Sequence, residues 1–553
     1  MTDQLNIAVA QLNPTLGDIA GNAERARTAR RRAAELGADL IVFTELFITG
    51  YPPEDLVMKP ALQAAARAAV EDLAKDTADG GPAMLMGTPW RDGDVLYNAV
   101  ALLDHGEVET VRYKVDLPNY GPFDEKRVFA PGPLPGPINF RGVRIGVPIC
   151  EDIWTDEICE CLEETGAEFM IVPNGSPFWI GKQDIRLNVV VARVTETSLP
   201  MLYANQVGGQ DELVFDGASF ALNADRSLAL QLPAWEETVA MTTWRREGGD
   251  WVCDPGETVP VEEGLEALYL ACVTGLRDYV EKNRFPDVVL GLSGGIDSAI
   301  CAAMAADALG PDRVHCVMLP YKYTSEDSIK DAAACAEALG VRYDVVPIAE
   351  PVEGFTSALK PLFDGMPADT AEENIQSRTR GTLLMAISNK FGPMVVTTGN
   401  KSEVSVGYAT LYGDMNGGFN PIKDLYKTQV YALSGFRNQH KPKDCLGPDG
   451  RVIPENIITK APSAELKEDQ TDQDSLPPYD KLDDILQSLV EGEMSIADTV
   501  ARGHDAATVE RIQHLLNIAE YKRRQAAPGV KVSQRNFGRD RRYPITNWFR
   551  DRA

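Results

Sequence analysis

A short apolar run, a glycine turn and a segment of small residues follow one another in this chain, and they constrain its fold most. They span residues 287–309, DVVLGLSGGIDSAICAAMAADAL. Val288, Val289 and Leu290 predict a buried parallel strand, and an apolar segment long enough for a helix begins at Ser298. The stretch therefore predicts a strand, a tight turn and a helix in direct succession.

The turn, SGGIDS at residues 293–298, has the chemistry of a phosphate cradle. Its glycines let the backbone bend tightly and approach a ligand, and the first N–H groups of the following helix attract an anion. Asp297 would repel a bare anion, so we expect Mg²⁺ to bridge its carboxylate and a phosphate. The alternative is an ordinary glycine turn that leads into a helix.

The same string is not a Walker A loop, because the Gly-Lys-Ser/Thr ending is absent. Placed after a buried strand, it resembles the SGGxDS pyrophosphate loop of the N-type ATP pyrophosphatases. These enzymes cleave ATP between the α and β phosphates and adenylylate a carboxylate or carbonyl. The resemblance implies ATP as co-substrate, with AMP and pyrophosphate as products.

The composition narrows the possible partners. A chain of 553 residues is too long for one ordinary core, so we expect at least two domains. A net charge of −28 argues against nucleic acid as the main partner, although a local basic pocket remains possible. Nine scattered cysteines, no visible secretory signal in MTDQLNIAVAQL and no long apolar run predict a cytoplasmic protein without a membrane span.

In the first half, apolar strand-like runs alternate with helical stretches, as in LNIAVAQLN, AMLMGTP and AEFMIVPNGSPF. This pattern favours a sheet-rich α/β sandwich over a helical bundle. After Asn223 the strand signals thin, and the segment 237–266 has the clustered Gly, Pro and charge of a connection between domains. We therefore expect a first domain at 1–246, a linker at 247–261 and a second domain at 262–553.

Three polar residues follow strand-like runs: Glu45 in FTELFITG, Lys114 in YKVDLPNYG and Cys150 in VPICEDIW. Taken singly, they are explained by a solvated strand end, a surface ion pair and a buried small residue. A thiol of pKa about 8.5 needs a base and a cation to act as a nucleophile at neutral pH. Glu45 could take the thiol proton and Lys114 could stabilise the oxyanion, which gives amide hydrolysis through a thioester.

These three segments resemble, in order, the Glu, Lys and Cys motifs of the nitrilase or carbon–nitrogen hydrolase superfamily, over residues 5–230. The resemblance implies an αββα sandwich with Glu45, Lys114 and Cys150 as base, oxyanion cation and nucleophile. It also implies a set of residues that line a glutamine pocket: Tyr51, Tyr120, Phe123, Glu125 and Ser176. Cys159 and Cys161 lack a second pair or a flanking His, so we interpret them as ordinary helix residues.

In the second half, strands and helices alternate again, which predicts a doubly wound parallel sheet with ligands at the carboxyl ends of its strands. Thr324 with Asp327 predicts a helix start, Gly340 a helix end, and residues 374–391 a further helix. The polar loop after the strand PMVVTTGN would be an ordinary loop by itself. Beside a pyrophosphate loop, it suggests a second Mg²⁺ carboxylate and a cation for phosphate.

The motifs TTGNKSE, YGD, LYKTQV and KAPSAELKEDQTDQDSLPPYD resemble, in order, those of the glutamine-dependent NAD⁺ synthetases. This resemblance covers almost the whole chain. It implies adenylylation of nicotinic acid adenine dinucleotide (deamido-NAD) by ATP, followed by attack of glutamine-derived ammonia. The residues that it implies are Ser293, Gly294, Gly295, Asp297, Ser298 and Thr398 for ATP, Asp297 and Glu403 for the metal, and Arg378, Asp414, Lys427 and Ser463 for deamido-NAD.

Two further segments have more than one interpretation. Residues 424–467 are charged and show little periodicity, so we expect an exposed loop that could also close over the adenylate. The basic end of the chain, from residue 521, suggests either a nucleic-acid arm or a packed segment. The interleaved Phe537, Tyr543, Pro544 and Trp548 favour a packed segment that lends cations to the active site or to a homo-oligomer interface.

Ammonia in bulk water is mostly protonated at neutral pH, so we expect a sheltered passage from the thiol to the adenylate. Two alternatives stay open. The chain could amidate a different acceptor, or it could be a nucleotide-binding regulatory protein with an inert thiol.

Overall fold

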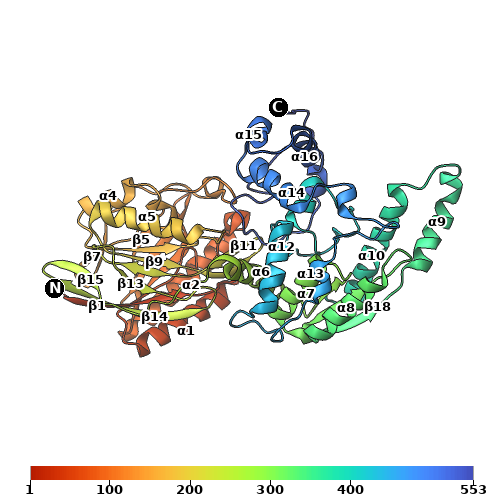
Figure 1. Ribbon diagram of the computed structural model, residues 1–553. Coiled ribbons are helices and arrows are strands. Elements are labelled where there is room, and N and C mark those ends of the chain that lie inside the picture. The colour runs from red at the N-terminus through yellow and green to blue at the C-terminus, as the bar shows by residue number, and fades with distance from the viewer. Residues whose placement is uncertain (1, 552–553) are drawn as a thin grey trace. The chain divides into compact units, whose positions relative to one another are not determined.

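The computed structural model describes residues 2–551 and divides the chain into two compact units, Met1–Glu262 and Glu263–Ala553 (Figure 1). Each unit has its own sheets and its own apolar core. In residues 2–551, no helix combines the length and the apolar character that crossing a bilayer requires.

The first unit contains two mixed sheets, of seven and six strands. The seven-stranded sheet runs in the order β15-β14-β1-β2-β3-β4-β5 and the six-stranded sheet in the order β13-β12-β9-β8-β7-β6. Their strands are β1 Gln4–Gln11, β2 Leu40–Val42, β3 Ala83–Asp92, β4 Val95–Asp104, β5 Glu107–Tyr113, β6 Ile138–Phe140, β7 Val143–Gly146, β8 Phe169–Asn174, β9 Met201–Asn205, β12 Phe220–Leu222, β13 Leu228–Gln231, β14 Thr238–Glu247 and β15 Asp250–Cys253. A separate ribbon pairs β10 Val207–Gln210 with β11 Leu213–Asp216.

The two sheets pack face to face and helices cover both outer faces. Alternate residues of β1, such as Ile7 and Val9, meet Ile171 and Leu202 of the other sheet. Helices α1 Ile19–Glu35 and α2 Pro60–Asp76 cover the seven-stranded sheet, and α4 Glu157–Glu164 and α5 Lys182–Thr197 cover the other. The predicted αββα sandwich is therefore confirmed.

The expected linker at 247–261 begins too early. Strand β14 ends at Glu247, turns through Gly248 and Gly249, and pairs with β15 in an antiparallel hairpin. Both glycines have positive φ, of +60° and +110°, which suits a tight hairpin turn. Residues 247–253 thus belong to the sheet of the first unit.

The second unit is built on a parallel sheet of four strands in the order β18-β17-β16-β19. The strands are β16 Val288–Gly291, β17 Val314–Met318, β18 Arg342–Val345 and β19 Met394–Val395. After β16 the chain adds β17 and β18 on one side and then returns to place β19 on the other. This reversal is a topological switch point, where open α/β sheets bind ligands at the carboxyl ends of their strands. The predicted doubly wound parallel sheet is confirmed.

Most of the remaining elements of the second unit are helices. They are α6 Gly264–Lys282, α7 Ile296–Leu309, α8 Glu326–Leu339, α9 Ala349–Phe363, α10 Thr370–Phe391, α11 Lys401–Val406, α12 Lys427–Gln439, α13 Glu455–Thr459, α14 Tyr479–Leu486, α15 Ile496–Ala501, α16 Ala506–Ile518 and α17 Glu520–Arg523. Helix α10 packs through Leu384 and Ile387 against Val289 and Val317 of the sheet. Helices α11, α14, α15 and α16 share a separate core.

Helix α8 ends as predicted but starts one residue later. Gly340 is its left-handed C-cap, whereas the N-cap is Ser325, whose Oγ accepts the N–H of Ser328 at 3.1 Å. Thr324 instead accepts the N–H of Tyr321.

The predicted exposed loop at 424–467 is wrong over much of its length, because α12 and α13 lie within it. Val430 and Leu433 of α12 are fully buried. The buried Arg437 donates to Asp307 of α7 and to the carbonyl of Pro448, so it also holds the turn that follows α12. The sequence pattern did not predict this helix, because a charged residue such as Arg437 is normally exposed, whereas here it is buried in an ion pair.

The basic end of the chain is buried at several residues up to 541 and makes only scattered contacts after it, such as that of Asp551 with the N–H of Ile496. Val532 and Ser533 donate their N–H groups to Asp424, and Lys401 donates to Ser533 Oγ and the Arg535 carbonyl. Phe537 is buried, as expected. Tyr543 is partly exposed, but its ring lies against the guanidinium of Arg541, 3.5 Å from the ring centroid. Pro544 and Trp548 are exposed, so the prediction that they pack is wrong for these two residues.

Candidate functional site

A fully buried lysine is the centre of a cluster in the first unit. Lys114 follows β5, and its Nζ donates to Glu45 Oε1 at 2.7 Å and to both oxygens of Glu125 at 3.0 and 2.9 Å. Burial alone would lower the pKa of Lys114, but Glu125 and Glu45 raise it well above its usual value. The ammonium therefore stays charged in a site without solvent.

Cys150 lies beside this cluster, at the start of the short turn after β7. It is buried and has a left-handed backbone, with φ +46°. Burial raises the pKa of the thiol well above its usual range, repulsion by Glu45 adds to this, and Lys114 opposes it. The resting sulfur therefore carries its proton, and a base must remove it before it can attack.

The carboxylate of Glu45 is held on both oxygens. Oε1 accepts Lys114 and the Nδ2 of Asn98 at 2.8 Å, and Oε2 accepts the N–H of Gly175 at 3.0 Å. Asn98 is a buried residue of β4 that the sequence analysis missed. Its signal was a single amide within the apolar strand VLYNAVALLD.

Asp152 joins the segments that carry the lysine and the cysteine. Its Oδ1 accepts the N–H groups of Val115 at 3.0 Å and Asp116 at 2.7 Å, and its Oδ2 accepts that of Ile149 at 2.9 Å. Burial raises the pKa of Asp152 to about 7, although these backbone N–H groups act in the opposite direction.

The predicted glutamine-pocket residues surround this cluster. Tyr51 is buried and its hydroxyl donates to Glu125 at 2.8 Å. The ring of Phe123 lies 6.4 Å from that of Tyr51 and 5.7 Å from that of Tyr120. Tyr120 is 52% exposed and donates to Glu151. Ser176 is buried directly after Gly175.

In the second unit, the turn after β16 has the shape that the glycines predicted. Gly294 has φ +78°, and a Cβ on it would lie 2.3 Å from the carbonyl oxygen of Ser328, so no larger residue fits there. Gly295 is the N-cap of α7 and donates its N–H to Ser293 Oγ at 3.2 Å. The hydroxyls of Ser293 and Ser298 are 3.1 Å apart.

This turn lines a cavity of about 450 Å³. The predicted residues that line it are Ser293, Gly295, Asp297, Ser298, Thr398, Glu403, Asp414, Lys427 and Ser463. Gly294 belongs to the turn but faces Ser328. Arg378 lies outside the cavity, is exposed and donates to the Leu411 carbonyl. Ser463 donates to the carbonyl of Gln470 within its own loop.

One lysine forms ion pairs with two carboxylates that line this cavity. Lys427 Nζ lies 2.5 Å from Asp297 Oδ2 and 3.1 Å from Glu403 Oε1. Burial raises the pKa of Glu403 to about 8, with Lys427 acting against this and Asp297 repelling it. Asp472 also lines the cavity, and its buried Oδ1 has no hydrogen-bond partner among residues 2–551. Asp297 and Glu403, which share Lys427, are carboxylates of the kind that a divalent cation prefers.

Arg380 and Lys460 also line the cavity and were missed by the sequence analysis. Burial lowers the pKa of Arg380 to about 10, and its Nε donates to the Leu319 carbonyl. The guanidinium forms no ion pair within the described part of the chain, which suits an anionic ligand. Its helix has no strong apolar periodicity, so the sequence could not separate it from Arg378.

Two family models match the chain: the carbon-nitrogen hydrolase model over residues 6–249 and the NAD synthase model over residues 268–526. A glutamine-dependent NAD(+) synthetase from Rhodobacter capsulatus is 52% identical over the full length of both chains. Another from Acinetobacter baylyi is 44% identical over 98% of each chain.

The chain belongs to the glutamine-dependent NAD(+) synthetase family.

A solved glutamine-dependent NAD+ synthetase from Acinetobacter baumannii, in complex with ADP, aligns with a TM-score of 0.78 at 41% identity. It covers 98% of this chain and 99% of its own. One from Cytophaga hutchinsonii, at 22% identity, shares the fold with a TM-score of 0.81 over 98% of both chains.

Proposed function

We propose that the protein synthesises NAD⁺ from deamido-NAD, with ATP for activation and glutamine as the nitrogen donor. One observation carries the proposal: a single chain holds both a buried thiol beside a carboxylate-bridging lysine and a phosphate-loop cavity. The full-length similarity to glutamine-dependent NAD(+) synthetases supports the same reaction.

In the first unit, Cys150 attacks the side-chain amide of glutamine. Glu45 takes the thiol proton as the sulfur–carbon bond forms, and the Lys114 ammonium stabilises the negative oxygen of the tetrahedral intermediate. The proton then passes to the leaving nitrogen, which departs as ammonia. Water hydrolyses the thioester to glutamate, with Glu45 as base. Tyr51, Tyr120, Phe123, Glu125 and Ser176 are proposed to hold the substrate.

In the second unit, the carboxylate of deamido-NAD attacks the α-phosphorus of ATP, and pyrophosphate leaves. Ammonia then attacks the acyl carbon, and AMP leaves as NAD⁺ forms. We assign the ATP phosphates to the turn at residues 293–298 and to Thr398, because the free N–H groups of α7 open into the cavity there. Arg380 is a further candidate for phosphate.

Deamido-NAD is assigned to Asp414, Lys427 and Ser463, which line the same cavity. Arg378 remains a proposal from its motif alone, because it lies outside the cavity. Lys427 has a second function as the counter-charge of Asp297 and Glu403.

Mg²⁺ would be held by the carboxylates of Asp297 and Glu403, which line the cavity and both contact Lys427. When bound, it would neutralise phosphate charge during adenylyl transfer. We also propose a cytoplasmic location, in keeping with nine unpaired cysteines. Large apolar side chains exposed on α9, such as Phe355 and Leu362, support a homo-oligomer.

The test is product analysis after mixing the protein with ATP, Mg²⁺, glutamine and deamido-NAD. We expect NAD⁺, AMP, pyrophosphate and glutamate. Cys150→Ala is the control: it should abolish the use of glutamine and leave synthesis from ammonium salts intact. AMP release with a different carboxylated acceptor, and none with deamido-NAD, would contradict the proposal.

A further inference from the structure

A wholly buried arginine lies next to the thiol site, and the proposed chemistry does not use it. Arg186, on α5, is 1% exposed. A buried guanidinium is costly unless it is paired and fully hydrogen-bonded. Asp216, at the end of β11, supplies the pairing: Arg186 Nη1 lies 2.7 Å from each of its carboxylate oxygens.

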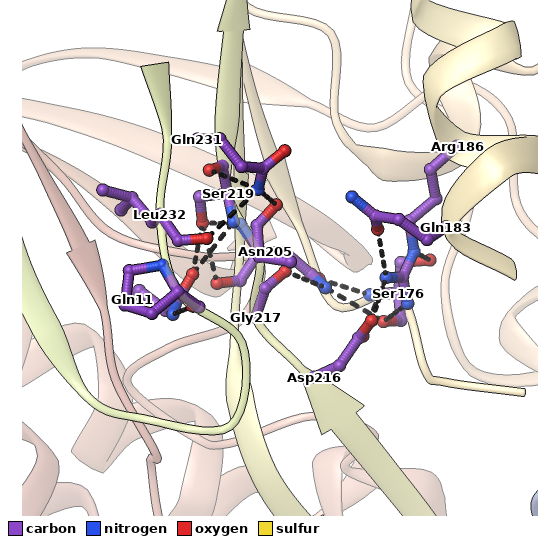
Figure 2. A network of polar contacts seen from close by, with 12 residues as sticks. Gln11, Ser176, Gln183, Arg186, Asn205, Asp216, Gly217, Ser219, Gln231 and Leu232 are labelled. Carbon is purple, nitrogen blue, oxygen red and sulfur yellow. Dashed lines mark hydrogen bonds and ion pairs between the residues drawn. The ribbon is translucent and has the colours of Figure 1, made fainter. Parts of the chain in front are cut away.

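The other two nitrogens of the guanidinium, Nε and Nη2, form hydrogen bonds with Ser176, a residue of the predicted glutamine pocket. Nε donates to Ser176 Oγ at 3.1 Å, and Nη2 donates to the Ser176 carbonyl at 2.7 Å (Figure 2). The two bonds reach the side chain and the main chain of the same residue. They therefore fix both the rotamer of Ser176 and the orientation of its peptide group.

Asn205 holds the same residue from β9. Its Oδ1 accepts the N–H of Ser176 at 2.9 Å, and its Nδ2 donates to the Ser176 carbonyl at 3.2 Å. The network continues through Ser219 to Gln11 at the end of β1, in the other sheet (Figure 2). Every polar group of Ser176 is thus bound by buried residues of the scaffold.

The residue before Ser176 meets the reacting groups. Gly175 donates its N–H to Glu45 Oε2 at 3.0 Å, and the same N–H favours the thiolate of Cys150. A Cβ on Gly175 would lie 2.7 Å from the ring of Tyr51, so this peptide has little room to shift. A small displacement of residues 175–176 would therefore change the position of the base relative to the sulfur.

We propose that Arg186, anchored by Asp216, is a positioning residue for glutamine hydrolysis, because it holds residues 175–176 so that the Gly175 N–H stays on Glu45. The inference rests on the proposed glutaminase function of the first unit. Lysine cannot replace this arginine, since one ammonium cannot reach Asp216 and both acceptors of Ser176 in the fixed geometry of the planar fork.

The experiment compares two full-length variants, Arg186→Lys and Arg193→Lys. Arg193 is on the same helix and pairs with Glu196, away from residues 175–176. In Arg186→Lys we expect kcat for glutamine hydrolysis to fall about 10–100-fold, with KM changed less than about threefold, in the range typical of supporting hydrogen-bond partners. Arg193→Lys should match the wild type.

Synthesis from ammonium salts is the internal control. It depends on the second unit and should stay unchanged in both variants, which shows that the second unit is intact, while a nearly unchanged KM for glutamine shows that the first unit is folded. A wild-type protein that does not hydrolyse glutamine would contradict the proposed function itself. Wild-type activity combined with an unimpaired Arg186→Lys variant would overturn the positioning inference alone.

Chemical rescue separates positioning from bulk stability. Arg186→Ala leaves space where the guanidinium was, so added guanidinium ion should restore part of the glutamine hydrolysis in a saturable way. A variant that was merely destabilised would lose further activity, because guanidinium weakens folded proteins. Absence of recovery in an Arg186→Ala protein that still synthesises NAD⁺ from ammonium would contradict the proposal.

Discussion

At the scale of single residues, Glu45 has two opposite effects on Cys150. Its charge makes the thiolate less stable, and its carboxylate is the group proposed to take the thiol proton during catalysis. Cys150 rests protonated because burial and the charge of Glu45 both disfavour the thiolate. The same carboxylate that raises the thiol pKa is the proposed proton acceptor. Removing it should therefore change the reactivity of the sulfur and its catalytic competence in opposite directions.

We predict that Glu45→Gln speeds the alkylation of Cys150 by iodoacetamide at pH 7, because the thiol pKa falls when the repelling charge is removed. The same variant should lose glutamine hydrolysis about 10²–10⁴-fold, the range typical of a general base. Mass spectrometry of the labelled peptide measures alkylation, with Cys150→Ala as the control for other cysteines. Slower alkylation in Glu45→Gln would contradict this account.

Several of these residues could be found from sequence because each follows a strand in a recognisable motif. Glu45, Lys114 and Cys150 are brought together as expected, and Glu125, which follows no strand and was implied by the resemblance alone, joins them. The partners of Asn98 and Arg186 could not be found, since they are distant in the chain: Asp216, for example, is 30 positions after Arg186. Periodicity predicts which face is buried, but it does not predict which buried polar group meets which.

At the scale of elements, two turns set the geometry of the sites. The first is the turn after β7, which Asp152 ties to the end of β5 through the N–H groups of Val115 and Asp116 and closes on itself through that of Ile149. The second is the glycine turn after β16, where the carbonyl of Ser328 excludes any side chain at residue 294. In each, one residue links a strand end to a neighbouring segment.

We predict that Asp152→Asn changes the pH dependence of stability. The folded pKa of about 7 lies above the usual carboxyl value of 3.8, so the contribution of Asp152 is fully present below that usual value and is lost as pH rises towards 7. The asparagine does not titrate, so the melting temperature of the variant should rise relative to the wild type between pH 5 and pH 8. A pH-independent difference would contradict the raised pKa.

A pair of adjacent glycines tests the second turn. Gly294→Ala meets both a left-handed backbone and the Ser328 carbonyl, whereas a Cβ on Gly295 would find only Ser293 Oγ, at 3.3 Å. The left-handed conformation alone costs about 1–2 kcal/mol, so Gly294→Ala should melt several degrees lower than Gly295→Ala. It should also lose the rise in melting temperature that ATP gives the wild type. Equal melting temperatures would argue against the crowded turn.

The elements themselves were predicted best where apolar periodicity was strong. The strands of both units and the helix after the glycine turn are examples. Helix α12 was missed because its charged residues, such as Arg437, pair inside the protein and disguise its buried face. The β14–β15 hairpin had a Gly-Gly signal in its turn, but the short strand after it was taken for a linker.

At the scale of the whole molecule, one chain couples a reaction that releases ammonia to one that consumes it. Isotope labelling can measure whether the nitrogen of NAD⁺ comes directly from glutamine or from ammonium in solution. We predict that, during glutamine-driven turnover in ¹⁵N-labelled ammonium, most of the NAD⁺ formed is unlabelled, because ammonia that is transferred through a sheltered passage does not mix with the largely protonated bulk pool. Mass spectrometry of NAD⁺ is the readout, and Cys150→Ala, which depends on bulk ammonium, should give fully labelled product. Extensive labelling in the wild type would exclude a sheltered transfer.

The chain has a net charge of −28 but a basic end. The contacts of that end explain what its cations do. Lys531 bonds to the carbonyls of Ser533 and Gln534 and pairs with Asp540, and Arg523 pairs with Glu520. These cations serve the fold of the second unit, which removes the main argument for a nucleic-acid arm.

Ala526 and Ala527 form part of the wall of the nucleotide cavity, and the segment after them is fastened to Asp424 and Lys401. A variant that lacks residues 526–541 would therefore keep every thiol-site residue and lose part of the cavity wall. Such a protein would be expected to consume glutamine without using the ammonia, and so to waste nitrogen.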